Sequence, residues 1–481
     1  MEVRLFFEFL QVAIGYTKSL SVSVAAADWY RLFEFCKKQA LIGVGFTAVE
    51  RLHTKGIVCP EELRIKWYAL AVHIERRNRL LNGLCKNVTE QYEHDGFFTC
   101  ILKGQGNILN YPKRLGVRRQ SGDIDVWATP INDDGLRIKD KGIAIAVQTG
   151  KNKVEYVEYH GHKAIREYVR MLHRLEGNIE KPVIRYHHIE APKIDGTEVE
   201  VHFRPCYDHS PLRNRRMQRW FNDHADVCMK NKTHMGFAVP TASVNVIYQM
   251  CHLFSHYFDE GLGLRQLMDY YFALRVWHND VMECKDLQSQ GMWSEGLGTP
   301  VMSAQEVMAV IRSFGMGKFA GAVMWVLNEV FGGTNENDNE NEKGQRRTRR
   351  ETDGGPQADF VGKRESSEFK RNLNGGPQAD GVREQQLSSI GQQLKENNFA
   401  PWMICEPNEK EGKKLMEEIM KGGNFGQYDT RDAALKKGGM MKHGFWKLKR
   451  VMRLLSSYPE EALWEPVFRV YHLFWRVYHN R

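Results

Sequence analysis

Two aspartates separated by one residue are the most chemically suggestive feature of the chain. They lie in the segment Ser121-Gly122-Asp123-Ile124-Asp125-Val126, and the residue pattern predicts a strand over Asp123–Trp127. Residues two apart on a strand project from the same face, so the carboxylates would lie a few ångströms apart. Because like charges that close repel, the pair suits a divalent metal ion with oxygen ligands. The alternative is the solvated face of an edge strand.

Basic residues that could hold phosphate precede this segment. Lys103-Gly104 follows a predicted strand over Phe97–Leu102 and opens a predicted helix, whose free amides and lysine suit an anion. Arg119 lies four residues before Asp123 and offers forked donors. Gly122 would let the turn approach a ligand closely.

A third carboxylate is available further along the chain. The segment Thr197–Arg204 is predicted to be a strand that places Glu198, Glu200 and His202 on one face. Three carboxylates on neighbouring strands, opposite groups that hold phosphate, are what two-metal phosphoryl chemistry requires.

The elements around these residues predict an α+β protein, with a small mixed sheet between large helical regions. Residues 1–92 are predicted to be helical and residues 93–207 to form the α/β core. That core would contain a helix over His162–Leu175 and a further strand over Val183–Ile189, joined to the next strand by an Asp195-Gly196 turn.

Helix is predicted again over residues 208–332 and 389–481, and Gly422–Asp429 is expected to be a turn between two helices. Residues 333–388 contain few apolar side chains and two copies of the hexapeptide GGPQAD. We expect this stretch to be a disordered linker. The basic run Arg346–Arg350 follows an acidic stretch and is interpreted as part of that solvated linker.

Composition narrows the classes of protein. The 481 residues are 42% apolar and 26% charged, which excludes wholesale disorder, and the net charge of +9 is too small for a dedicated nucleic-acid binder. The longest weakly charged apolar run, Phe319–Leu327, is too short for a bilayer, and the N-terminus does not resemble a signal peptide. We therefore expect no membrane insertion. Nine cysteines without a C-x-x-C pair indicate reduced thiols and a cytoplasmic location.

Several histidines are candidate metal ligands. His252 and His256 have a helical spacing that can bind zinc, but a structural role is favoured because they lie beside an apolar stripe. A second group lacks regular ligand spacing and is interpreted as loop or sheet-surface histidines: His160, His162, His187 and His188. Arg265 and Asp269 are expected to form an ion pair within one helix.

Taken together, these motifs resemble the polymerase-beta-like nucleotidyltransferase superfamily. Within it, the chain is similar to a bacterial family named "uncharacterised nucleotidyltransferase". The residues that carry the resemblance are Lys103-Gly104, Tyr111-Pro112, Arg119, Gly122–Asp125, Glu200–Arg204, His252–Tyr271, the GGNFG sequence within Gly422–Asp429, and Tyr458–Trp464.

The resemblance implies that Asp123 and Asp125 bind two Mg²⁺ ions, with Mn²⁺ as an alternative ion, and that Glu200 completes the catalytic and metal-binding set. Glu198 stays open as an alternative to Glu200. The implied nucleotide-binding residues are Lys103, Gly104, Arg119, Ser121 and Gly122. One departure is the Lys-Gly pair, with 18 residues between Gly104 and Asp123, where many members carry Gly-Ser or Gly-Gly about ten residues before the aspartates.

The implied activity is transfer of a nucleoside monophosphate from an NTP to an acceptor hydroxyl. The acceptor stays open between a small molecule, an RNA and a protein, and no oligomeric state is implied. The second hypothesis is a non-catalytic module that binds a nucleotide or a partner on the same fold.

Overall fold

A computed structural model describes eight stretches of the chain: residues 2–130, 142–150, 153–177, 182–289, 301–332, 400–431, 433–436 and 439–479. The predicted linker at 333–388 lies outside the described residues, as do the basic run and the first residues of the region 389–481.

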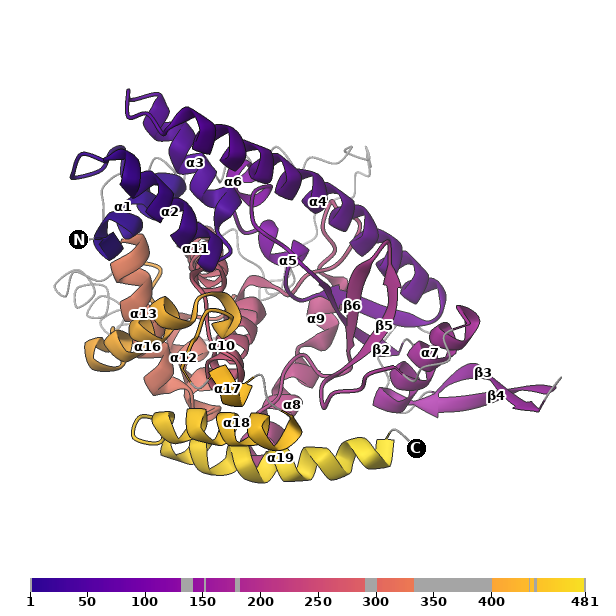
Figure 1. The fold of residues 1–481 in the computed structure, drawn as a ribbon. Coiled ribbons are helices and arrows are strands. Elements are labelled where there is room, and N and C mark those ends of the chain that lie inside the picture. The colour runs from indigo at the N-terminus through magenta and orange to yellow at the C-terminus, as the bar shows by residue number, and fades with distance from the viewer. Residues whose placement is uncertain are drawn as a thin grey trace, which may run out of the picture.

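The N-terminal region is helical, as predicted. Its helices are α1 (Glu2–Ile14), α2 (Ala26–Lys38), α3 (Ile42–His53) and α4 (Glu61–His94). Apolar residues at helical spacing bury one face of each helix; in α2 that face consists of Trp29, Leu32, Phe33 and Cys36. The long helix α4 runs past the helical part of the molecule and ends beside the sheet (Figure 1).

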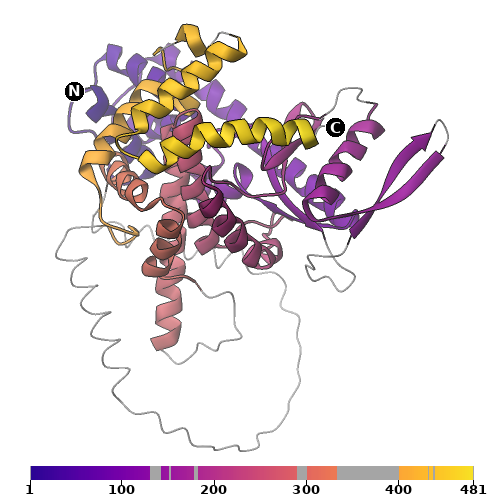
Figure 2. The ribbon, with the colours of Figure 1, turned by 90° about the horizontal axis from the view of Figure 1, so that it is seen from below.

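A four-stranded mixed sheet carries the predicted carboxylates. Its strands are β1 (Phe97–Ile101), β2 (Ile124–Pro130), β5 (His188–Ile194) and β6 (Thr197–His202), in the order β1-β2-β6-β5. The pair β2–β6 is parallel, whereas β1–β2 and β5–β6 are antiparallel. Strands β3 (Gly142–Gly150) and β4 (Lys153–His160) form a separate hairpin that projects from the sheet (Figure 2). The sequence patterns did not predict this hairpin.

Two strand predictions were displaced. The strand placed at Val183–Ile189 lies at His188–Ile194, because the Asp195-Gly196 turn comes directly before β6 and its hairpin partner must end there. Pro192 does not end this strand, since β5 is at the sheet edge, where a missing N–H is tolerated. Strand β2 begins at Ile124, one residue after its predicted start, so Asp123 precedes the strand.

Helices cover both faces of the sheet (Figure 1). The helix α7 (Gly161–Leu175) was predicted almost to the residue, and it packs on one face beside the end of α4. The helices α5 (Gln105–Ile108) and α6 (Lys113–Gly116) connect β1 to β2, and each is a single turn. On the opposite side of the sheet lie α8 (Pro211–Asp223), α9 (Ala225–Lys230) and α10 (Ala242–Asp259).

The remaining helices complete the large helical part, and the segment Gly422–Asp429 is a turn between helices, as predicted. The elements are α11 (Leu264–Ser289), α12 (Ala304–Ser313), α13 (Gly317–Phe331), α16 (Glu409–Gly422), the 3₁₀ turn η1 (Asn424–Gly426), α17 (Ala433–Lys436), α18 (Met440–Leu454) and α19 (Pro459–His479).

Two hydrophobic cores hold these elements together. The larger core joins α1–α4 to α10–α13 and α16, so helices from both ends of the chain share one interior. The smaller core lies between α7 and the sheet, and it includes Phe468 and Trp475 of α19. Figure 2 shows α19 lying across the helical part with its C-terminal end at the sheet. The α+β class is therefore confirmed; the residue boundaries of the five regions stay a prediction.

Two further observations bear on the sequence-based expectations. No helix within the described stretches is long and apolar enough to span a membrane. All nine cysteines are free thiols, and seven of them are buried.

Candidate active site

Strand pairing brings together carboxylates and a histidine from distant parts of the sequence. In the parallel pair of β2 and β6, Asp125 lies opposite Glu200 and Trp127 lies opposite His202. Residues two apart on a strand share a face, so Asp125, Glu200 and His202 all point away from α7. The opposite face carries the apolar neighbours, such as Val126 and Val201, which pack in the smaller core. The alternation of side chains along β2 and β6 therefore places the carboxylates and His202 on the face away from α7.

The three side chains form a compact group. His202 Nε2 lies 3.0 Å from Asp125 Oδ1 and 3.5 Å from Glu200 Oε2. The antiparallel pairing of β5 with β6 places His188 beside His202, and His188 Nδ1 lies 3.4 Å from Glu200 Oε2. Asp125, Glu200 and His202 offer ligand atoms within 4.8 Å of one another, as do His187, His188 and His202. Either group has the composition of a metal site.

Lys103 supplies a positive charge to this group. Its Nζ lies 2.5 Å from Asp125 Oδ1, and its side chain is 18% exposed. Burial alone would lower the lysine pKa, but the charges of Asp125, Glu200 and Asp123 outweigh burial and raise it. The ammonium group therefore stays protonated at neutral pH.

Gly104 permits the turn that delivers Lys103. Its φ is +53°, a backbone conformation that residues with a side chain rarely adopt. A Cβ there would lie 3.3 Å from the backbone oxygen of Asp123. The turn after β1 can therefore pack closely against the start of β2.

The acids and bases of the site have shifted pKa values. Burial opposes ionisation of Asp125, but Lys103 and His202 outweigh it and lower the Asp125 pKa. The Glu200 pKa is also lowered, because the hydrogen bond to His202 and the charge of Lys103 outweigh burial. Burial and the neighbouring His202 lower the pKa of His188 to about 3. At pH 7 the site therefore holds two carboxylates and a neutral His188 ring.

One buried oxygen is left without a partner. Asp125 is 1% exposed, and within the described part of the chain its Oδ2 accepts no hydrogen bond. A buried carboxylate oxygen without a partner is unfavourable and calls for a donor or a cation. The residues present therefore fit a divalent ion at this position.

Arg119, predicted to contact the nucleotide, has protein partners. It is 4% exposed, and its Nε and Nη2 each donate to a carboxylate oxygen of Asp269 in α11 at 2.7 Å. Its Nη1 donates to Ser121 Oγ, also at 2.7 Å, while Tyr111 donates to Asp269 Oδ1 at 2.6 Å. Arg119 thus ties the turn before Asp123 to α11, and its contact with a nucleotide stays a prediction.

The expected ion pair between Arg265 and Asp269 is not the contact that the structure contains. Arg265 instead donates to the backbone oxygen of Gln120 at 2.8 Å. Asp269 turns toward Arg119 because the buried fork of a guanidinium matches a carboxylate with two parallel hydrogen bonds.

The remaining predicted residues occupy different surroundings. Asp123 is half-buried just before β2, where its charge acts on Lys103, Arg119 and Arg265. Gly122 is exposed, and a Cβ there would meet no protein atom within 4 Å. Glu198 is exposed and lies 2.8 Å from Lys193 Nζ. Of the two candidates for the third carboxylate, the structure brings Glu200 to Asp125.

Histidines of β5 and β6 are the main residues that sequence reasoning missed. The interpretation of His188 as a loop or sheet-surface histidine was wrong, since it is 7% exposed and contacts Glu200. His202 had been placed on the same face as Glu200 but was assigned no role. The available signal was that alternation, because a histidine two residues from a candidate carboxylate on a strand shares its face.

Helix α10 and the Asn424–Gly426 turn lie beside the site. The pKa of His252 is lowered by burial and by the charges of His256, Lys103 and His202. The rings of His252 and His256 lie 4.3 Å apart, and His256 in turn lies 5.0 Å from the ring of Phe425. The guanidinium group of Arg265 lies over the same Phe425 ring, 5.2 Å from its centroid. The Asn424–Gly426 turn is therefore linked to the sheet residues through the two histidines of α10.

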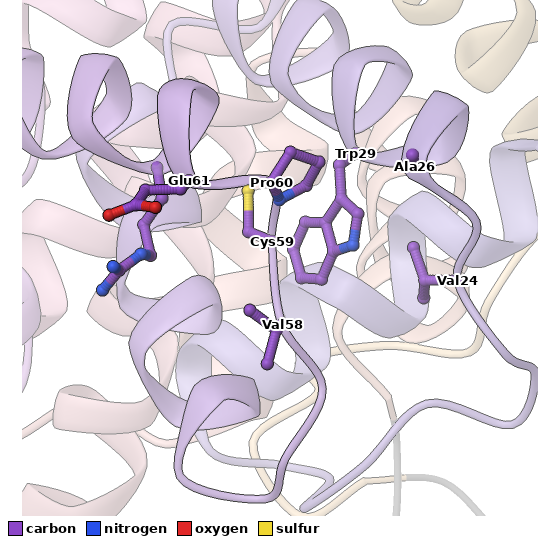
Figure 3. Close-up of a pocket in the computed structure, with 8 residues that line it drawn as sticks. Val24, Ala26, Trp29, Val58, Cys59, Pro60 and Glu61 are labelled. Atoms are coloured by element: carbon purple, nitrogen blue, oxygen red, sulfur yellow. The ribbon is translucent and has the colours of Figure 1, made fainter.

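An open hollow of about 370 Å³ lies elsewhere, among the N-terminal helices (Figure 3). It is lined by residues between Val24 and Arg64, among them Trp29 and Cys59, and by none of the site residues above. Its lining offers no cluster of acids or histidines.

Fold and site together define an α+β protein with a candidate divalent-cation site on a small mixed sheet. The profile of the family described as "Uncharacterised nucleotidyltransferase" matches residues 25–291, which are 267 of the 481 residues. The chain belongs to this family, as the resemblance implied, and the match includes Lys103, Asp123, Asp125 and Glu200. No curated protein and no solved structure was found to match the chain.

Proposed function

We propose that the protein transfers a nucleoside monophosphate from an NTP to an acceptor hydroxyl, with release of pyrophosphate. The family indicates nucleotidyl transfer in general. The observation that carries the proposal is the pairing of Asp125 with Glu200 on adjacent parallel strands, beside Lys103. A buried and a half-buried carboxylate with lowered pKa values, one of which has an unpartnered oxygen, are surroundings that suit a divalent ion.

Asp123, Asp125 and Glu200 would hold the divalent ions, Mg²⁺ or Mn²⁺. Bound there, the ions neutralise charge on the transferring phosphoryl group and lower the pKa of the attacking hydroxyl. Lys103 adds a positive charge beside the same carboxylates. Arg119, held by Asp269, orients the Ser121–Gly122 turn that leads into Asp123.

The acceptor belongs to one of three classes: a small molecule, an RNA end or a protein side chain. The turn at Phe425 and the α10 histidines, which lie beside the sheet residues, are proposed to form its surroundings. The free cysteines fit a reducing, cytoplasmic setting, which we propose for the protein.

The test uses NTPs labelled at the α-phosphate, incubated with the full chain and Mg²⁺ or Mn²⁺. Separate reactions contain small-molecule alcohols, RNA or protein, and both label transfer and pyrophosphate release are measured. We expect Asp125→Asn and Glu200→Gln to lose more than about a hundredfold in rate, since even outer partners of a metal ligand are worth 10–100-fold.

Glu198→Gln is the matched control, because Glu198 lies on the same strand but is exposed and pairs with Lys193. It should keep the wild-type rate. Undiminished transfer by Asp125→Asn would contradict the proposal. Metal-dependent NTP binding without pyrophosphate release in the presence of any of the acceptors would instead favour a non-catalytic nucleotide-binding module.

A further inference from the structure

We infer that Asp125, Glu200 and His202 form a mixed oxygen–nitrogen site for one first-row transition metal ion of the zinc type. The inference deepens the proposed function, on which its catalytic meaning rests, by assigning His202 as a metal ligand and His188 as a positioning residue. The site would hold its ion before any nucleotide binds, and this ion would be one of the divalent ions that the proposed function places at Asp125 and Glu200.

The geometry of the three side chains supports a shared ion. In a tetrahedral site with bonds of about 2.0–2.2 Å, neighbouring ligand atoms lie about 3.3–3.6 Å apart. His202 Nε2 lies 3.0 Å from Asp125 Oδ1 and 3.5 Å from Glu200 Oε2, and all three ligand atoms lie within 4.8 Å of one another. Small shifts of the three side chains would therefore bring their ligand atoms to the spacing of a tetrahedral metal site.

The surroundings of the group point in the same direction. Asp125 and His202 are each 1% exposed, and Asp125 Oδ2 has no partner among the described residues. Three protein ligands with a further position open are the pattern of catalytic zinc sites. The backbone holds these ligands in place, because Asp125 and Glu200 are paired across rigid parallel strands.

The donor set selects the kind of ion. Mg²⁺ takes oxygen ligands and keeps several waters, whereas imidazole nitrogen favours zinc and its first-row neighbours. An oxygen-only set would have favoured Mg²⁺, Ca²⁺ or Mn²⁺. With His202 between two carboxylates, the site favours the borderline ions.

His188 acts through Glu200. Its Nδ1 lies 3.4 Å from Glu200 Oε2, and His188 is itself buried beside His187. A ring in this position orients the carboxylate toward the ion. Such outer partners typically contribute 10–100-fold to metal affinity.

Lys103 competes with the ion for Asp125. Its ammonium group lies 2.5 Å from Asp125 Oδ1 and supplies positive charge to the same carboxylates. Binding of the metal therefore requires the ammonium group to move away from Asp125, and His202 Nε2 to give up its hydrogen bond to Asp125 Oδ1.

The experiment measures metal binding by the full chain without nucleotide, after treatment with a chelator. Zn²⁺ and Mg²⁺ are titrated by calorimetry, and Co²⁺ is titrated by visible absorption, which reports nitrogen and oxygen ligation. We expect one equivalent of Zn²⁺ to bind at least a hundredfold more tightly than Mg²⁺. Zn²⁺ should also displace Co²⁺, and a large excess of Mg²⁺ should not.

His202→Asn should lose more than a hundredfold in Zn²⁺ affinity and lose the Co²⁺ absorption, and His188→Ala should lose between tenfold and a hundredfold. His53→Ala is the matched control, because His53 is exposed at the end of α3. Circular dichroism checks that each variant is folded. The displacement measurement on the wild-type protein needs no variant.

Equal affinities for Zn²⁺ and Mg²⁺, or unchanged Zn²⁺ binding by folded His202→Asn, would overturn the inference. Failure of nucleotidyl transfer together with intact Zn²⁺ binding would overturn the proposed function and leave the metal site standing. The two failures are therefore distinguishable.

Discussion

At the scale of single residues, the site depends on balanced charge in a buried place. Asp125 is 1% exposed, and its charge is met by Lys103 on one side and His202 on the other. Breaking a buried ion pair by removing one partner is costly, because the remaining charge stays buried without compensation. The buried Asp125 carboxylate therefore needs a neighbouring cation, which can be the Lys103 ammonium group or a metal ion.

This balance predicts the behaviour of Lys103→Met. Without metal, the variant should lose about 3–5 kcal/mol of stability, since Asp125 and Glu200 lose their nearest fixed cation. Zn²⁺ or Mn²⁺ should restore much of that loss, and the metal-induced rise in melting temperature should exceed that of the wild type. Thermal unfolding with and without metal measures both effects. A metal-free variant as stable as the wild type would contradict the assigned role of Lys103.

At the scale of elements, the Asn424–Gly426 turn packs against the loop between α10 and α11 through very close backbone contacts. Gly426 has φ +62°, and a Cβ built there would lie 2.1 Å from the backbone oxygen of Glu260. Phe425 adopts φ +53°, a conformation that is strained for a residue with a side chain. The neighbouring contacts hold it there, with His256 and Arg265 against its ring. Strain of this kind is often found at functional sites.

Gly426→Ala should therefore destabilise the protein by about 2 kcal/mol or more, through the backbone clash and the strained φ. If Phe425 borders the acceptor, nucleotidyl transfer should fall even in the folded fraction. Urea unfolding and transfer rates measure the two effects.

Gly444→Ala is the matched control for this substitution. Gly444 lies inside α18, and a Cβ there would meet no atom within 4 Å. Alanine should stabilise that helix by about 0.5–1 kcal/mol. Equal effects of the two substitutions would argue against a tight contact at Gly426.

At the scale of the whole molecule, α19 is held by ion pairs between buried residues. Its partners lie at the start of α8 and in the loop that precedes it. His209 and Arg213 both contact Glu461 of α19, and Arg213 Nε also donates to Asp208 at 3.0 Å. Burial opposes the charge on His209, but Glu461, Asp259 and Glu465 outweigh it and raise the His209 pKa to about 9. Burial and Glu461 raise the pKa of Asp208 to about 7.

These shifts predict a loss of stability at alkaline pH. Because the folded pKa of His209 exceeds its unfolded value of about 6.5, its stabilisation is fully present below pH 6.5 and disappears as the pH rises through about 9. The raised pKa of Asp208 acts in the same direction between about pH 4 and 7. The free energy of unfolding should therefore fall by roughly 3 kcal/mol between pH 6.5 and 9.5.

Urea unfolding at a series of pH values measures this dependence. His209→Gln should flatten the curve between pH 6.5 and 9.5, and His53→Gln, at an exposed position, should leave it unchanged. A wild-type stability that is constant over this range would refute the link between His209 and α19.

The sequence by itself determined the class of fold and the candidate carboxylates. Helical spacing of apolar residues predicted α2, α7 and α10, because amphipathic periodicity is a local property of the chain. Alternation placed Glu200 and His202 on one face of β6 for the same reason. The choice of Glu200 over Glu198 could not be made locally, since both share that face.

Only the tertiary structure decided which residues meet. A bulge in the pairing of β5 with β6 shifts the register by one residue between Ala191 and Ile194, and this shift brings His188 beside His202. Counting back from the Asp195-Gly196 turn would have assigned His188 to the wrong face, because a one-residue slip reverses every side chain.

Arg119 illustrates the same limit at longer range. Its partner Asp269 is 150 residues away, and the pairing depends on how α11 packs against the turn before β2. Local sequence patterns indicate which residues are buried and which are charged. The partners of those charges are chosen by packing between elements that are distant in the chain, which is why the structure was needed to assemble the site.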